Sequence, residues 1–277
     1  MSAFLTLILF TIPALASLHC RPQLADGCVL TACVGTIGNY PAPVVALWPP
    51  GPRSLRVHLH GFSERVDSSG ALLGPYQPDY DWDNVRYPTP EAATRAFAED
   101  RADSPAKLLR AYGMARQMCQ RGEAVVVPTS RGHCHTYAQH FISPRTLGRF
   151  VEEVHGALGF PASLPLHLSG HSGAGKTMQA VLAAETPTLA RLERITAFDA
   201  FYSSAQTQAL SDWAYRRGRR QVRVVVLNSG SPRAYARRAW RFPRHNLPNG
   251  SQIHSHTVTE AEGADHWSLV RDFWTWP

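Results

Sequence analysis

Lysine is almost absent from this chain. Of its 28 basic residues only Lys107 and Lys176 are lysines, so arginine supplies nearly all of a formal net charge of +7. A basic balance indicates anionic surroundings such as cell-envelope polymers, lipid headgroups or nucleic acid, but it does not choose among them. We expect no nucleic-acid partner. An anionic envelope surface stays open, as does a basic surface with no partner.

The chain also lacks internal repeats and low-complexity segments, and its longest apolar run is short for a helix that spans a bilayer. With 277 residues, 44% apolar and 18% charged, its composition is that of a globular protein, so disorder is not expected. The length fits one large α/β domain or two small ones.

The N-terminus indicates export. Residues 3–16 are uncharged and mostly apolar, and Ala14-Leu15-Ala16 forms a small-residue cleavage site before Ser17. The positively charged start of a secretory signal peptide is missing, so a short membrane anchor is the alternative. We predict a signal peptide over residues 1–16, a catalytic domain over residues 17–277, and a secreted or periplasmic location.

Five cysteines remain in the predicted mature chain: Cys20, Cys28, Cys33, Cys119 and Cys134. Disulfides are expected in an exported protein. The candidate pairs are Cys28–Cys33 or Cys20–Cys28, together with Cys119–Cys134, and the odd count leaves one thiol free. Sequence alone does not fix the pairing, and no spacing resembles a zinc framework.

Short apolar runs alternate with helix-like segments, which is the pattern of βαβ units around a parallel sheet. We therefore predict an α/β fold with a mostly parallel sheet flanked by helices. The predicted strands are residues 44–48, 55–60, 124–128, 164–168, 195–198, 222–227 and 252–258. The predicted helices are residues 91–98, 105–119, 145–158, 175–185, 205–217, 232–240 and 267–274. An irregular insertion at about 62–104 interrupts the rhythm and is interpreted as a lid, a binding loop or a surface excursion.

Residues 164–177, LPLHLSGHSGAGKT, carry the most informative pattern in the chain. An apolar run enters a glycine-rich turn, and a helix-compatible run leaves it. Residues 170–174, GHSGA, are close to the G-x-S-x-G nucleophile elbow, which would make Ser172 a nucleophile. Residues 170–177 also satisfy G-x-x-x-x-G-K-[ST], the phosphate-cradling loop, which would make Lys176 a phosphate ligand.

Hydrolysis by a serine needs a nucleophile, a base, an acid that orients the base, and donors for the oxyanion. Gly170 and Ala174 flank Ser172 with the small side chains that a sharp turn requires. Gly173 would supply one oxyanion N–H, because the start of a helix directs N–H groups and a positive dipole end at developing negative charge.

The second oxyanion donor and the base are expected after other strands. A strand ends in His60-Gly61, so the N–H of Phe62 would be the second donor. His266 lies between the last predicted strand and the C-terminal helix, and is the leading candidate for the base among 13 histidines.

The acid is assigned to Asp199, at the carboxyl end of the strand that follows the nucleophile. Open α/β sheets build their sites at that edge. Asp265, next to the base, is the fallback. The order Ser172, Asp199, His266 is the hydrolase order Ser…Asp…His.

On these residues the chain resembles the α/β-hydrolase superfamily from about Val44 to the C-terminus. The resemblance implies a mostly parallel sheet flanked by helices and hydrolysis of an ester, amide or related acyl bond, with no cofactor. The substrate would be a small-molecule or polymeric acyl compound. Ala174 departs from the family pattern by replacing the second glycine, and the acid comes early. The motifs are His60-Gly61-Phe62, Val125–Pro128 with Arg131-Gly132, Gly170–Ala174, Asp199, and Asp265-His266-Trp267.

Two rival interpretations remain. A P-loop nucleotide-binding protein would explain the strand before the motif, the helix after it, and residues 195–199 as an apolar run ending in a magnesium-binding aspartate. Export, the strands that precede the motif and the unexplained His266 segment oppose it. The other rival is a non-catalytic envelope-binding module, whose basic surface would be residues 216–220, RRGRR, and Arg237-Arg238 with Arg241. The first of these clusters precedes a strand and is expected on the side away from the site.

No metal site is predicted. His133, His135 and His140 cluster after a strand, but no carboxylate or cysteine completes a recognisable metal site, and lining of a loop or pocket is preferred. Residues 79–84 have alternating carboxylates like part of a calcium loop, without its central glycine or terminal glutamate.

Overall fold

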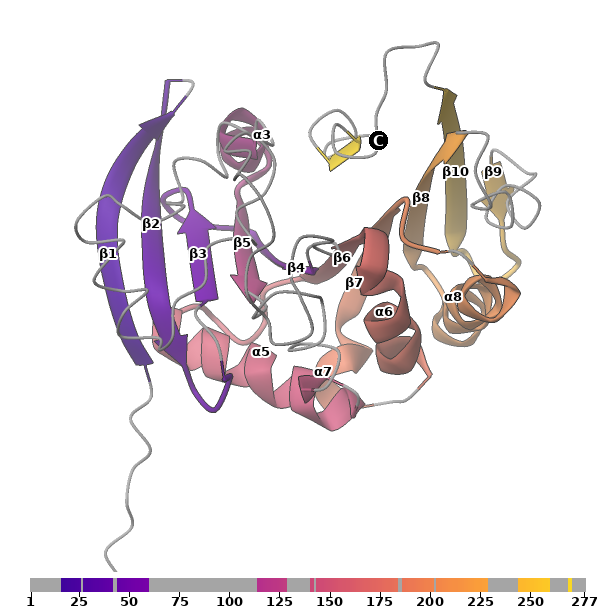
Figure 1. Cartoon of the computed structure of the whole chain (residues 1–277), viewed down its shortest axis with the longest axis horizontal. Helices are drawn as coiled ribbons and strands as arrows, with labels where there is room; N and C mark the ends of the chain where they lie inside the picture. The colour runs from indigo at the N-terminus through magenta and orange to yellow at the C-terminus, as the bar shows by residue number, and fades with distance from the viewer. Residues whose placement is uncertain are drawn as a thin grey trace, which may run out of the picture.

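The computed structural model describes residues 16–25, 27–41, 44–59, 114–128, 140–141, 143–183, 186–201, 203–228, 244–259 and 269–270. In this part of the chain a ten-stranded sheet has the order β1-β2-β3-β5-β4-β6-β7-β8-β10-β9 (Figure 1). The strands are β1 (Ala16–Ala25), β2 (Cys28–Ile37), β3 (Val44–Trp48), β4 (Ser54–Leu59), β5 (Glu123–Pro128), β6 (Leu166–His171), β7 (Leu192–Phe198), β8 (Gln221–Asn228), β9 (Arg244–Asn246) and β10 (Gln252–Thr259). The helices are α3 (Met114–Arg121), α5 (Pro144–Leu158), η2 (Ser172–Ala174), α6 (Gly175–Leu182), α7 (Pro187–Ala190) and α8 (Ser204–Arg217).

The centre of the sheet is parallel. Strands β5, β4, β6, β7, β8 and β10 pair in parallel with one another. Antiparallel pairs extend this core through β3, β2 and β1 on one side and through β9 on the other. The predicted fold class is therefore confirmed. All seven predicted strands are present, whereas β1, β2, β9 and the short helix α7 are not foreseen by the sequence pattern.

Four of the predicted helices have counterparts in α3, α5, α6 and α8. The predicted helices at 91–98 and 232–240 lie outside the described residues, as do the insertion at 62–104 and all of 267–274 except Leu269 and Val270. Local signals fix two of the observed helix ends. Helix α5 ends at Gly159 in the left-handed region at φ 68°, and Ser203 and Gln206 form a capping box at the start of α8.

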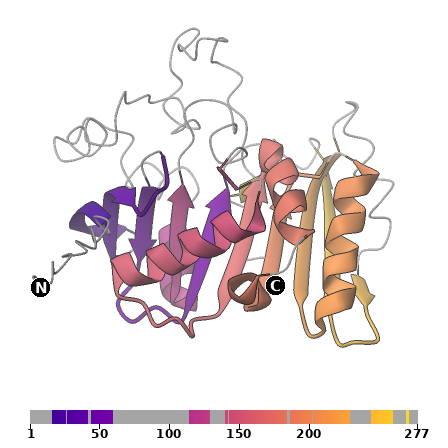
Figure 2. The same cartoon turned by 90° about the horizontal axis from the view of Figure 1, so that it is seen from below.

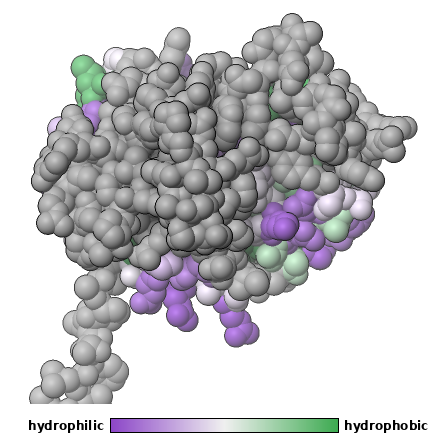
Figure 3. Space-filling model, viewed as in Figure 1, coloured by the Kyte–Doolittle hydropathy of each residue, from purple (hydrophilic) through white to green (hydrophobic). Residues whose placement is uncertain are grey.

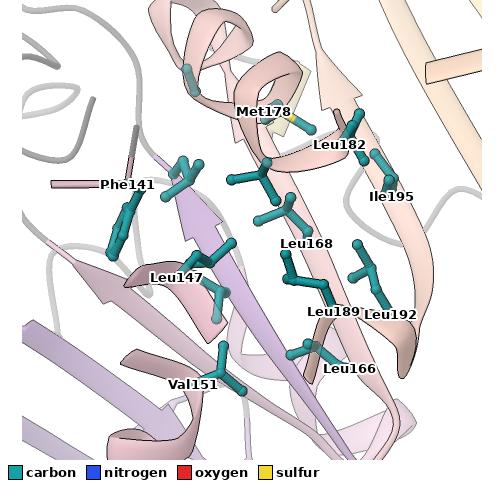
Figure 4. Close-up of a cluster of buried hydrophobic side chains, with 14 of the residues drawn as sticks. Phe141, Leu147, Val151, Leu166, Leu168, Met178, Leu182, Leu189, Leu192 and Ile195 are labelled. Atoms are coloured by element: carbon teal, nitrogen blue, oxygen red, sulfur yellow. The ribbon is translucent and has the colours of Figure 1, made fainter. Parts of the chain in front are cut away.

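The larger hydrophobic core lies between the sheet and the helices α5, α6 and α8, which cover one face (Figure 2). Alternate residues of each strand point to this face, because successive side chains of a strand point to opposite sides. Leu166 and Leu168 of β6 thus meet Met178 and Leu182 of α6 and Val151 of α5 in one buried cluster (Figure 4).

Helix α3 covers part of the opposite face. A second cluster there contains Ala115 and Met118 of α3 with Val125 and Val127 of β5. Val125 and Val127 alternate with Ala124 and Val126, which belong to the first cluster. This strand is therefore buried on both faces, as its nearly continuous valine run indicates.

The disulfides differ from the predicted pairs. Cys20 is bonded to Cys33, and Cys28 to Cys119. The candidates Cys28–Cys33, Cys20–Cys28 and Cys119–Cys134 are therefore wrong. Cys20 and Cys33 face each other across the β1–β2 hairpin with their Cα atoms 4.1 Å apart, and this register is what the sequence pattern does not reveal. Cys134 lies outside the described residues.

None of the described helices is long and apolar enough to cross a membrane. Residues 1–15, which make up nearly all of the predicted signal peptide, lie outside the described residues. The predicted cleavage before Ser17 would leave all of β1 except Ala16 in the mature chain.

Candidate active site

Ser172 lies where β6 turns into a helix at the carboxyl edge of the sheet. Strand β6 runs to His171, the single turn η2 begins at Ser172, and α6 follows at Gly175. The backbone of Ser172 has φ 50°, in the left-handed region that residues other than glycine rarely adopt. The nucleophile elbow of the α/β-hydrolases is a serine on a sharp, strained strand-to-helix turn of this kind.

The residues around Ser172 are small because the turn leaves no room. A Cβ atom on Gly170 would overlap the sulfur of Met178 and stand 3.0 Å from the Cβ of Ala174. Gly175 is similarly confined, since its Cβ would overlap the carbonyl oxygen of Ala200. The requirement for small residues beside the serine, predicted from the motif, therefore has a physical cause in the packing of α6.

Gly173 follows the serine within η2 and is partly exposed. Gly173 thus stands at the start of the helical segment, where backbone N–H groups point toward the carboxyl edge of the sheet. This position suits the oxyanion donor that the sequence assigns to Gly173.

Asp199 lies at the same edge, one strand away. It is the first residue after β7, is 1% exposed, and has φ 44°, again in the left-handed region. Its N–H donates to the carbonyl oxygen of Val225 at 2.7 Å. Because His171 and Phe198 are register partners, Ser172 and Asp199 leave two adjacent parallel strands at the same level. The structure thus brings together two of the three predicted triad residues.

The other predicted site residues lie outside the described part of the chain. These are His266, its neighbour Asp265, the oxyanion residue Phe62, and the preceding His60-Gly61. Their roles stay predictions.

A pair of polar side chains that the sequence analysis does not single out lies below the edge. His58 of β4 and Ser169 of β6 are register partners, both are buried, and the His58 Nδ1 and Ser169 Oγ atoms are 2.9 Å apart. His171 is buried on the same face, two residues further along β6. The alternation of polar and apolar residues in both strands is the signal that could have revealed this polar stripe.

A buried ion pair lies further down the same face. Arg56 Nη2 is 3.0 Å from Glu123 Oε2, and both side chains are 1% exposed. His167 Nδ1 lies 2.7 Å from Glu123 Oε1, and because a carboxylate only accepts, the ring N–H is the donor of this hydrogen bond. Burial raises the pKa of Glu123, but the charge of Arg56 and the bond from His167 outweigh it and lower that pKa to about 2. Burial lowers the pKa of His167, and the opposing bond with Glu123 does not restore it.

The turn also bears on the P-loop interpretation. Gly170 and His171 belong to β6, and Gly170 is paired with Leu59 and Ala197 on the strands either side. The N–H groups that surround phosphates belong to a loop between the strand and the helix, and here only Ser172–Ala174 separates β6 from α6. Lys176 is exposed in the first turn of α6. No feature of this turn favours nucleotide binding.

The basic segment 216–220 lies at the end of the molecule opposite to Ser172. It joins the end of α8 to the start of β8, at the amino edge of the parallel strands. In the view of Figure 3, hydrophilic and hydrophobic side chains are mixed on the coloured surface where α8 lies. The predicted position away from the site is confirmed, while binding to an anionic surface stays a prediction.

Metal ligands do not gather in the described part of the chain: no group of three His, Cys, Asp or Glu side chains there could hold an ion. Of the three clustered histidines, His140 is described, and its ring packs edge-on against Tyr40 and Phe141. His133, His135 and residues 79–84 lie outside the described residues.

The fold and the turn at Ser172 have the arrangement found in one class of α/β proteins. A mostly parallel α/β sheet, with a strained serine between a strand and a helix at its carboxyl edge, is the architecture of the α/β-hydrolases. The resemblance predicted from the sequence is therefore confirmed at the level of the fold.

No family model matches the sequence, and no curated protein matches it either. Among solved structures, the chain is similar to a dienelactone hydrolase from Anabaena variabilis, with 12% identity over 93% of this chain and 90% of that one, at a TM-score of 0.41. It is similar to a poly(3-hydroxybutyrate) depolymerase from Bordetella parapertussis, with 13% identity over 94% and 90%, at a TM-score of 0.41. An esterase from a marine bacterial metagenome has 10% identity over 94% and 84%, at a TM-score of 0.44. At these identities and TM-scores, the similarities do not indicate an activity for this chain. The function is therefore inferred from the chain's own residues.

Proposed function

We propose that the protein is an exported serine hydrolase that cleaves an ester or related acyl bond. The observation that carries this proposal is the strained backbone of Ser172 between β6 and α6. Strain of this kind costs about 1–3 kcal/mol and persists only where the surrounding structure enforces it, which happens most often at functional sites.

In this mechanism Ser172 Oγ attacks the acyl carbon and His266 takes its proton. Asp199 holds His266 in the tautomer that accepts the proton and stabilises the imidazolium that forms. The N–H groups of Gly173 and Phe62 stabilise the oxyanion of the tetrahedral intermediate. His266 then gives the proton to the leaving group, which departs and leaves the acyl group on Ser172. Water, deprotonated by His266, attacks this acyl group and releases it from Ser172.

Ser172 and Asp199 follow register partners on two adjacent parallel strands, and this supports the choice of Asp199 as the acid. Asp265 is the alternative acid. Export is proposed from the N-terminal sequence, and two disulfides agree with an oxidising compartment. The substrate is a small-molecule or polymeric acyl compound.

Labelling of the mature protein, from Ser17 onward, with a fluorophosphonate probe tests the proposal. We expect the wild type to be labelled, Ser172→Ala not to be labelled, and Lys176→Ala to be labelled like the wild type. Because the acid orients and stabilises the base, Asp199→Asn should slow labelling by roughly 10²–10⁴-fold.

A folded wild type that takes up no probe would refute the serine hydrolase. Labelling that persists in Ser172→Ala would refute the assignment of the nucleophile. An Asp199→Asn variant that is labelled at the wild-type rate would transfer the role of the acid to Asp265.

A further inference from the structure

Three arginines lie in a row on the sheet face that α3 partly covers. In the register of the sheet, Arg56 on β4 lies opposite His167 on β6, and His167 lies opposite Arg194 on β7. Arg223 on β8 stands two residues after Gln221, the register partner of Arg194. Register partners share a face, as do residues two apart in one strand, so Arg56, Arg194 and Arg223 lie on one face. We call these three the arginine row.

Within the described part of the chain, positive charges around the row outnumber negative ones. Arg194 is attracted by Glu123 and by the exposed Glu193, and is repelled by Arg56 and Arg121. Arg56, Arg121 and Arg194 all repel Arg223, and among the described residues Glu123 is the group that attracts it. Glu123 is already engaged, since it is paired with Arg56 at 3.0 Å and bonded to His167 at 2.7 Å.

Arg223 differs from the other two arginines of the row, because Arg56 is paired with Glu123 and Arg194 is bonded to Gln221. The Arg223 side chain is 7% exposed, its Nη1 atom is buried without a hydrogen-bond partner, and no hydrogen bond joins it to a described residue. Burial, together with Arg194, Arg121 and Arg56, lowers the pKa of Arg223 to about 9. A buried guanidinium left in this state is costly unless a partner of opposite charge is present.

Arg194 stands beside it with donors to spare. Its Nε donates to Gln221 Oε1 at 2.9 Å, which uses one of the five N–H donors that a guanidinium carries. Burial, with repulsion from Arg56 and Arg121, lowers the pKa of Arg194 to about 10. Planar forks of this type match the paired oxygens of carboxylates, phosphates and sulfates.

We propose that the arginine row binds a small oxyanion, with Arg223 and Arg194 donating to a phosphate, sulfate or carboxylate group. The low exposure of Arg223 favours a small free anion, because an extended anionic surface would meet the exposed Arg216 and Arg219 instead. The site is separate from the candidate active site. Arg194 lies near the start of β7 and Asp199 follows its end, a separation of roughly 16 Å along the strand.

The test measures the melting temperature of the full mature chain with sodium phosphate, sodium acetate or sodium chloride at one ionic strength. A ligand that binds only the folded state raises the melting temperature with its concentration. We expect phosphate or acetate to raise that of the wild type by roughly 3–8 °C relative to chloride. Whichever of the two gives the larger rise identifies the ligand as a phosphate-type or a carboxylate anion.

Two variants of the row and one control locate the effect. Arg223→Met removes the buried charge and keeps apolar bulk, so we expect it to melt no lower than the wild type in chloride and to lose the anion-dependent rise. Arg194→Gln should lose most of the rise as well. Arg149→Gln removes an exposed charge on α5, away from the row, and should keep the full rise.

The proposal is overturned if neither anion stabilises the wild type more than chloride does. It is equally overturned if Arg223→Met and Arg194→Gln keep the rise, or if Arg149→Gln loses it as they do, since the anion would then act on the whole charged surface. Melting is measured independently of hydrolysis, so failure of this proposal and failure of the serine hydrolase are distinguishable.

Discussion

At the scale of single residues, Ser172 and Asp199 share an uncommon backbone state. Their φ angles are 50° and 44°, and both follow directly on a parallel strand. In this conformation each side chain leaves the sheet at its carboxyl edge instead of continuing the alternation of the strand. The fold therefore accepts local strain at the two residues that the proposed chemistry uses most.

Replacing Ser172 by glycine should separate stability from activity. Glycine adopts positive φ without a steric penalty, so we expect Ser172→Gly to be more stable than Ser172→Ala by about 1 kcal/mol. Both variants should be inactive, because each lacks the nucleophile. Urea denaturation of the two variants gives the comparison, with the ordinary φ of Ser169 providing the control pair Ser169→Gly and Ser169→Ala.

Which variant of each pair is the more stable shows whether the backbone of Ser172 is strained. In the control pair alanine should be the more stable residue, since glycine in a strand loses more conformational entropy on folding. If Ser172→Gly is also the less stable member of its pair, the turn is not strained, and the main support for the nucleophile is lost.

The positions of Ser172 and Asp199 at strand ends could be predicted at this scale, whereas the grouping of the buried charged side chains could not. Ser172 and Asp199 are recognisable because a motif and a strand end mark them. Arg56 lies within β4, Glu123 begins the valine run of β5, and Arg223 comes shortly after the arginine-rich segment 216–220. Nothing local indicates that the sheet brings these three side chains together. Their relation depends on strand order and register, which pair β4 with β5 and β6.

At the scale of elements, α6 is fixed against the segment that follows β7. Gly175, the first residue of α6, lies so close to the Ala200 carbonyl that a Cβ would overlap it, and Gln206 Nε2 would be 3.1 Å away. Since Ala200 directly follows Asp199, this contact sets the position of the acid relative to the start of α6.

Gly175→Ala should therefore weaken both the fold and the proposed chemistry. We expect a loss of about 1–3 kcal/mol in the free energy of unfolding, because backbone atoms have to move. We also expect slower labelling by the fluorophosphonate probe, because the displacement reaches Asp199. Gly156→Ala in α5 is the matched control: its Cβ would meet nothing within 4 Å, so helix propensity should stabilise it by about 0.5–1 kcal/mol.

A Gly175→Ala variant as stable and as reactive as wild type would show that α6 and the Asp199 segment move independently. Loss of stability with normal labelling would show that the displacement does not reach the acid.

Which elements the sequence could predict follows from their position in the sheet. Strands β3 and β5 are short apolar runs that are buried on both faces, which makes them recognisable. Strand β10, in contrast, alternates buried and less buried residues from Ile253 to Ser255. The β1–β2 hairpin is different: β1 contains Arg21, Pro22 and Gln23, and its pattern is not that of a buried strand. Its place beside β3 depends on cross-strand pairing and on Cys20–Cys33, which are visible only after folding.

At the scale of the whole molecule, the two ends of the parallel strands have different characters. The carboxyl edge holds Ser172 and Asp199, while the amino half holds the ion pair of Arg56 and Glu123 and the arginine row. Glu123 is the residue on which the charge balance of that half depends, because it faces guanidinium groups on several strands. Its protonation should therefore control the acid stability of the fold.

The pH dependence follows from the direction of the pKa shift. The pKa of Glu123 is lowered from an ordinary value of 4.5 to about 2, so its contribution to stability is complete above pH 4.5 and is lost as the pH falls toward 2. Glu123→Gln removes the carboxylate that lies 3.0 Å from the buried Arg56 guanidinium, and we expect it to be less stable than wild type by about 3–5 kcal/mol at pH 7. The difference should shrink between pH 4.5 and pH 2, because the wild type then loses the same charge.

Denaturation of both proteins at intervals from pH 7 to pH 2 measures this difference. Glu193→Gln serves as the control, since Glu193 is an exposed carboxylate on β7, and it should stay within about 0.5 kcal/mol of wild type. Other carboxylates titrate in the wild type and in the Glu123→Gln variant alike, so they cancel in the comparison. A gap between these two proteins that stays constant down to pH 2 would mean that the charge of Glu123 does not stabilise the fold, and that its side chain matters there through packing alone.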